Sequence, residues 1–133
     1  MTTTSPTSPS ARLDPDAVKP QLRGRSHEYA FVVALTLAPI MIVAAPGIVP
    51  RFVIALYAVA IAALFGVSAL YHRIDWSPPA RARMKRLDHS MIFIAIAGTY
   101  TPIAVFALSS NIATIVLVAV WAGALIGIAI RNL

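Results

Sequence analysis

Apolar residues in this chain are gathered into four long stretches, separated by short polar or basic segments. The stretches run from about 29 to 49, 52 to 71, 91 to 108 and 112 to 130, and the corresponding transmembrane helices are expected at about 29–49, 52–71, 87–108 and 112–130. Each is close to the roughly 20 residues that a helix needs to cross the hydrocarbon core of a bilayer. Because a helix satisfies its own backbone groups there, the pattern predicts an all-α, polytopic transmembrane helix bundle over residues 27–133.

Turn and cap residues predict how these helices are joined. The short connections Pro50–Arg51 and 109–111 make consecutive helices antiparallel neighbours. Ser77, followed by two prolines, is typical of a helix N-cap, so the third helix should begin well before its apolar stretch. Pro102 removes the hydrogen bond to the Gly98 carbonyl and is expected to kink this helix.

Composition supports a membrane protein and excludes some chemistry. Hydrophobic residues make up 59% of the chain and charged residues only 12%, which leaves too little polar surface for a soluble domain. The chain has no cysteine, so disulfides, thiolate metal sites and a cysteine nucleophile are excluded. Residues 1–26 are rich in Thr, Ser and Pro, and we expect them to form a disordered, basic cytoplasmic tail.

The formal net charge of +6 is distributed very unevenly across the predicted membrane. Of the 11 basic residues, all but one fall on the same side, and that one is Arg51. The excess predicts a multi-pass protein of the cell membrane with a cytoplasmic N-terminus and the 72–86 loop on the same side. These cations would then face anionic headgroups, so the bilayer is the expected partner and nucleic acid is not.

Two places hold polar groups that burial in a membrane does not explain. Ser68 and His72 lie four residues apart and share one helix face, where His72 can be a metal ligand and Ser68 a substrate contact. The alternative is a histidine that reaches the headgroups and a serine that eases helix packing. Asp88 either pairs with Arg81, Lys85 or Arg86, or acts as a general base toward a water.

The other histidines are weaker candidates. His89 points about 100° away from Asp88 around the helix, and His27 precedes the first predicted helix, so we interpret His27 as an interfacial residue. In residues 98–102, Gly-Thr-Tyr-Thr-Pro, small and hydroxylated residues favour close helix packing. One histidine and one aspartate do not complete a zinc site, which usually takes three protein ligands.

Three ordered motifs resemble the bacterial hemolysin III family, which is related to the progestin and adipoQ receptors and to alkaline ceramidases. They are Ser-Ala-Leu-Tyr-His-Arg at 68–73, Arg-Leu-Asp-His-Ser at 86–90 and Ala-Gly-Thr-Tyr-Thr-Pro at 97–102, with a basic stretch at 23–27 before the first helix. The resemblance covers about residues 20–130. It implies a seven-helix membrane protein with a zinc site near the cytoplasmic face.

By this resemblance, His72 would be a zinc ligand, Asp88 would hold a zinc-bound water, and Ser68 would belong to the same site. The family's pattern also includes a His-x-x-x-His pair on its last helix, which is absent from this sequence. We therefore expect a C-terminally truncated member with four of seven helices and an incomplete zinc site.

The resemblance leaves three functions open. The first is a zinc-dependent hydrolase of lipid amides, with a lipid substrate and Asp88 and Ser68 as catalytic residues. The second is a membrane-perturbing or pore-forming hemolysin, and the third is a receptor-like protein with structural zinc. The sequence does not predict the oligomeric state.

Overall fold

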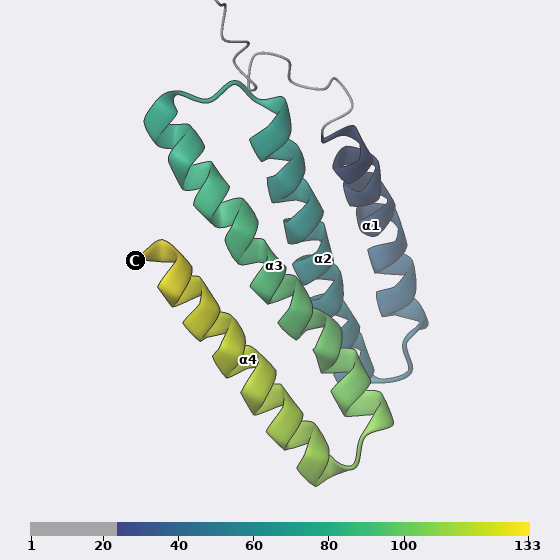
Figure 1. Cartoon of the computed structure of the whole chain (residues 1–133). Coiled ribbons are helices and arrows are strands. Elements are labelled where there is room, and N and C mark those ends of the chain that lie inside the picture. The colour runs from purple at the N-terminus through teal and green to yellow at the C-terminus, as the bar shows by residue number, and fades with distance from the viewer. Residues whose placement is uncertain (1–23) are drawn as a thin grey trace, which may run out of the picture.

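The computed structural model describes residues 24–133, which form four helices (Figure 1). They are α1 (Arg25–Ala44), α2 (Ile48–Arg73), α3 (Pro78–Ala107) and α4 (Ser110–Asn132). No strand occurs in this part of the chain, so the all-α prediction is confirmed. The predicted tail lies mostly outside the described residues, and α1 begins within its last positions.

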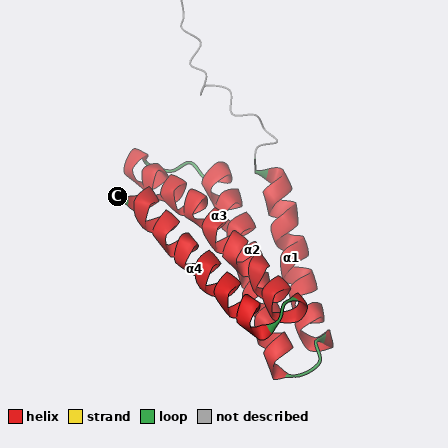
Figure 2. Cartoon of the chain, turned by 60° about the horizontal axis from the view of Figure 1, so that its bottom comes forward, coloured by secondary structure: helices red, strands yellow, loops and turns green. Residues whose placement is uncertain are grey.

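The helices lie side by side in one antiparallel layer, as two views of the chain show (Figures 1 and 2). Within residues 24–133, α1 contacts α2, α2 contacts α3 and α3 contacts α4, and no other pair of helices packs together. The expected bundle is therefore open, because α4 does not return to α1. Each helix presents side chains to a neighbour along one or two strips and leaves the rest of its surface uncovered.

The first connection differs from the prediction. It consists of residues 45–47, whereas Pro50 and Arg51 lie in the first turn of α2. The chain turns at Gly47, whose φ of 91° is readily adopted by glycine. A proline in the first turn of a helix is tolerated because the N–H at that position has no partner within the helix. Arg51 instead donates from Nε to the Ala45 carbonyl at 3.1 Å, which ties the connection to α2.

The start of α3 agrees with the prediction. The helix begins at Pro78, directly after Ser77 in the N-cap position, although the Ser77 side chain makes no capping hydrogen bond. From there α3 runs through Pro102 and ends at Ala107. It is the longest helix, and its first turns carry the basic residues that precede its apolar stretch.

Small residues fill the contacts between helices, and large apolar residues point outward. The buried apolar residues of the described chain are Ala45, Val53, Ala60, Ala95, Ala97, Ala104, Ala113 and Ala124. By contrast, Val43 is 74% exposed and Ile48 is 81% exposed. Small residues allow close approach between helices in a bilayer, where the outer apolar side chains meet lipid tails. All four helices are long and apolar enough to cross a membrane.

The α2 and α3 helices approach each other closely at Gly98. A Cβ atom placed on Gly98 would lie 2.5 Å from the Cβ atom of Ala60. Gly98 is therefore required by the contact itself, in agreement with the packing role predicted for residues 98–102. Thr99 and Thr101 donate their hydroxyl protons to the carbonyls of Ala95 and Ala97, not to the Gly98 carbonyl that Pro102 leaves without a partner in the helix.

Candidate functional site

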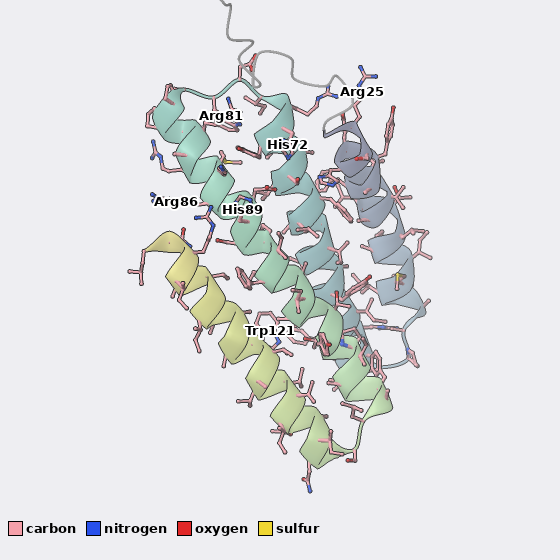
Figure 3. The ribbon with its side chains drawn as sticks, in the orientation of Figure 1. Arg25, His72, Arg81, Arg86, His89 and Trp121 are labelled. Atoms are coloured by element: carbon pink, nitrogen blue, oxygen red, sulfur yellow. The ribbon has the colours of Figure 1, made fainter. Side chains whose placement is uncertain are left out.

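Polar and basic side chains gather at one end of the helix layer. Arg25, His72, Arg81, Arg86 and His89 lie toward the end where α1 and α3 begin and α2 and α4 end, whereas Trp121 lies nearer the middle of α4 (Figure 3). The opposite end carries Arg51 as its one basic residue among residues 24–133. The described helices thus reproduce the one-sided distribution of charge that the sequence predicts.

A hydrogen bond between His27 and Ser68 joins α1 to α2 at this end. The Nδ1 atom of His27 lies 2.7 Å from the Ser68 hydroxyl oxygen. Ser68 is only 5% exposed, and its buried hydroxyl has a partner here. The His27 ring also packs against the Phe65 ring, with centroids 5.7 Å apart. His27 is therefore part of the polar cluster and lies inside α1, so the prediction that it precedes the first helix is wrong.

His72 lies beside this pair, one turn beyond Ser68 on α2. The centroids of the His27 and His72 rings are 6.5 Å apart, and the Tyr71 ring lies 4.8 Å from that of His72. Gly24 covers His72 from the start of α1: its φ is 93°, and a Cβ atom placed on it would lie 2.9 Å from the His72 Cβ atom. The structure thus places Ser68 and His72 in one cluster with His27.

An ion pair and an apolar groove lie on α1 and α2 next to these polar residues. Arg73 donates to a Glu28 carboxylate oxygen at 2.7 Å. The pair flanks a groove of about 280 Å³ whose apolar walls are Phe31, Gly66, Ala69 and Leu70. The charges of Arg73 and Glu28 offset each other. The groove is therefore lined by apolar residues and by one neutralised ion pair.

Asp88 makes no hydrogen bond or ion pair with this cluster. Its carboxylate, half-buried on α3, takes part in no hydrogen bond or ion pair with any residue of 24–133. The predicted ion pair with Arg81, Lys85 or Arg86 is therefore not formed in this part of the chain. The three basic side chains are exposed, whereas the Asp88 carboxylate is half-buried.

His89 and Ser90 belong to a second polar group, where α3 meets the end of α4. Arg131 donates from Nη2 to His89 Nδ1 at 3.1 Å. Asn132 donates to the Ser90 hydroxyl oxygen at 3.4 Å, and that hydroxyl donates to the Arg86 carbonyl at 2.8 Å. His89 therefore faces α4 and makes no hydrogen bond or ring contact with the His27 cluster.

The described residues do not gather a set of metal ligands. No group of three or more His, Asp or Glu side chains among residues 24–133 is close enough together to hold a metal ion. His27 and His72 supply two nitrogen donors, and the His27 Nδ1 atom is already bonded to Ser68. A catalytic zinc usually takes three protein ligands. These residues by themselves do not fit a complete zinc site.

The role of His27 was missed by the sequence analysis, although a signal was present. His27 and Phe31 are four residues apart and therefore share one face of α1. In the structure this face meets α2: His27 contacts Ser68, and Phe31 packs where a Cβ atom on Gly66 would lie 2.9 Å from its ring. The sequence signal was therefore a His-x-x-x-Phe spacing on the first helix together with Gly-x-Ser on its antiparallel neighbour. The glycine leaves room for the phenylalanine ring, and the serine can bond to the histidine.

Four apolar helices of spanning length, with polar side chains concentrated at one end, define a multi-pass integral membrane protein. The sequence profile of the haemolysin-III related family matches residues 16–133, and the chain belongs to this family. This result confirms the resemblance found in the sequence. No solved structure gives a significant match to the chain.

Proposed function

We propose that this membrane protein takes part in the hydrolysis of lipid amides or related lipids, and that His27, Ser68 and His72 form the part of the site contributed by α1 and α2. The observation that carries the proposal is the 2.7 Å hydrogen bond between His27 Nδ1 and the buried Ser68 hydroxyl, next to His72. Two histidine rings and a buried hydroxyl gathered at one junction between apolar helices favour a functional site, because polar groups in spanning segments usually serve a function.

The groove on α1 and α2 supports a lipid as the substrate. Its walls are apolar, and it lies on the same two helices as the polar cluster. A lipid amide has a polar group at the membrane surface and hydrocarbon chains below it. In the proposed complex, a chain of the substrate lies along Phe31 and Leu70, and its polar group lies at the helix ends beside the His27, Ser68 and His72 cluster.

Zinc is part of the proposal through the family resemblance. When bound, zinc activates a water and polarises a carbonyl. His72 would supply one ligand, and residues 24–133 contain no group of three side chains that would complete the set. By the same resemblance, Asp88 would orient a water at this site; it lies on α3, which packs against α2, and has no ion pair within residues 24–133.

Replacement of His72 tests this role. We expect His72→Ala to weaken zinc binding by more than about tenfold in a family member that also carries the remaining ligands, since even groups that only support a ligand contribute ten- to hundredfold. Zinc affinity is measured by competition with a chromogenic chelator, and hydrolysis by release of fatty acid from a fluorescent ceramide. The matched control is His89→Ala, because His89 bonds to Arg131 away from the cluster. Equal zinc affinity in both variants would contradict the proposal.

The orientation is also proposed: the end of the layer that carries His72 faces the cytoplasm of the cell membrane, because it holds most of the positive charge. The absence of cysteine allows a direct test with single cysteines at the exposed positions Pro46 and Ser77. We expect a membrane-impermeant maleimide added to intact cells to label Pro46→Cys and to leave Ser77→Cys unlabelled. Labelling of Ser77→Cys alone would reverse the orientation.

A further inference from the structure

A second groove lies at the basic end of the layer, between α3 and α4, on the far side of α3 from the α1–α2 pair. Its volume is about 490 Å³. Arg83, Arg86, Ser90 and Asn132 are its polar lining residues, and no aspartate or glutamate lines it. We call it the α3–α4 groove.

The lining of the α3–α4 groove changes from cationic to apolar along the helices. Arg83 and Arg86 lie in the first turns of α3, whereas Met91 and Ile94 lie one to three turns further along. On α4 the order is the same, with Asn132 at the end of the helix and Ile128 one turn before it. From Arg83 to Ile94 the helix rises roughly 16 Å at 1.5 Å per residue. The groove is therefore amphipathic along the membrane normal.

Charge separates this groove from the one on α1 and α2. There, Arg73 is paired with Glu28 at 2.7 Å, which offsets its charge. Neither Arg83 nor Arg86 forms an ion pair with a residue of 24–133. Arg83 donates from Nε to the Pro79 carbonyl, which leaves its terminal nitrogens available to an anion. Two guanidinium groups without a carboxylate are suited to phosphate, because each presents several N–H donors.

We propose that the α3–α4 groove binds an anionic phospholipid of the surrounding membrane, with the phosphate against Arg83 and Arg86 and an acyl chain along Met91, Ile94 and Ile128. The cationic end matches an anionic headgroup, and basic pockets between transmembrane helices are known to bind such headgroups. The apolar residues of the groove match an acyl chain. A free phosphate would leave these residues without a ligand contact, so the whole groove fits a lipid better than an inorganic anion. The site is separate from the His27, Ser68 and His72 cluster, so it does not depend on the proposed hydrolysis.

Lipid binding to the purified chain in detergent tests the headgroup end. We compare dioctanoyl phosphatidylglycerol with dioctanoyl phosphatidylcholine by native mass spectrometry. Phosphatidylglycerol is expected to bind more tightly, and Arg83→Gln/Arg86→Gln is expected to lower its affinity about 30-fold, the effect of two cations near an anionic headgroup. The matched control is Arg81→Gln/Lys85→Gln, which removes two charges from the same turns of α3 at positions outside the groove. An equal loss in the control would show non-specific attraction and overturn the proposal.

Two further measurements test the lipid itself and do not require a variant that folds. Glycerol 3-phosphate, which has the phosphate and no acyl chain, is expected not to displace phosphatidylglycerol; displacement at equal concentration would reduce the site to an anion site. A phosphatidylglycerol with a diazirine in its acyl chain is expected to label peptides that contain Met91, Ile94 or Ile128. Labelling spread evenly over the exposed faces of all four helices would overturn the proposal.

Discussion

Replacing Gly98 by alanine is expected to lower the free energy of unfolding by about 1–3 kcal/mol, the usual cost of overpacking. A Cβ atom at this position would lie 2.5 Å from the Cβ atom of Ala60, far inside the 3.5–4.0 Å of an ordinary carbon contact. Both atoms are attached directly to the backbone, so no side-chain rotation relieves the clash. The α2 and α3 helices must move apart, which also loosens the contacts on either side of this point.

The stability of purified Gly98→Ala is measured by unfolding in mixed micelles of sodium dodecyl sulfate and a mild detergent. Ala60→Gly in the same chain removes the opposing Cβ atom and is expected to restore most of the loss. Gly123→Ala is the matched control, because a Cβ atom on Gly123 meets nothing within 4 Å. Equal effects of Gly98→Ala and Gly123→Ala would show that helix propensity is responsible, and would contradict the close approach of α2 and α3.

Ser68→Ala removes the serine hydroxyl and is expected to destabilise the protein by about 1–3 kcal/mol. The reason is that the part-buried Nδ1 atom of His27 loses its hydrogen-bond partner. His27→Phe should have a cost of similar size, since it leaves the buried hydroxyl unpaired and retains the ring contact with Phe65. The double variant removes both groups at once. Because neither group is then left unpaired, its cost is expected to be smaller than either single cost.

The same unfolding assay measures this double-mutant cycle, with Ser26→Ala as the control for loss of an exposed serine hydroxyl on α1. Hydrolysis of the fluorescent ceramide is measured in parallel. If the bond serves only to join α1 to α2, the double variant regains activity together with stability. If Ser68 contacts the substrate, the double variant remains at least tenfold less active although it is stable. Strict additivity of the two stability losses would contradict the hydrogen bond.

The sequence was sufficient to predict the helices, because spanning segments produce long apolar stretches that few other structures require. It was less accurate at their ends. Residues 45–49 are all apolar apart from the glycine and continue the hydrophobic pattern, so the first helix was extended to position 49. In the structure the positive φ of Gly47 ends that continuity, and α2 starts at Ile48. The hydrophobic pattern shows which residues avoid water, but it does not show where the backbone turns. Here the turn depends on the conformation of Gly47.

Prediction of the candidate site was limited by what spacing along one helix reveals. The i, i+4 relation correctly placed Ser68 and His72 on a common face of α2. It did not reveal that His27 of α1 meets this face, or that Asp88 of α3 forms no bond with it. Those relations depend on the rotation of each helix about its axis relative to its neighbour. That rotation is set by contacts between small residues, such as Gly98 with Ala60. A single sequence shows where the small residues are but not which of them meet.

The open arrangement of the helices determines where polar chemistry is sheltered in this protein. A sheet of helices one layer thick has no interior, only the seams along which adjacent helices touch. The three buried polar residues of the described chain all lie in seams: Ser68 between α1 and α2, and Ser90 and Thr101 between α3 and α4, where Asn132 and Trp121 donate to them. The polar contacts of the α1–α2 seam share no residue with those of the α3–α4 seam. A substitution in one seam is therefore expected to leave the polar contacts of the other unchanged.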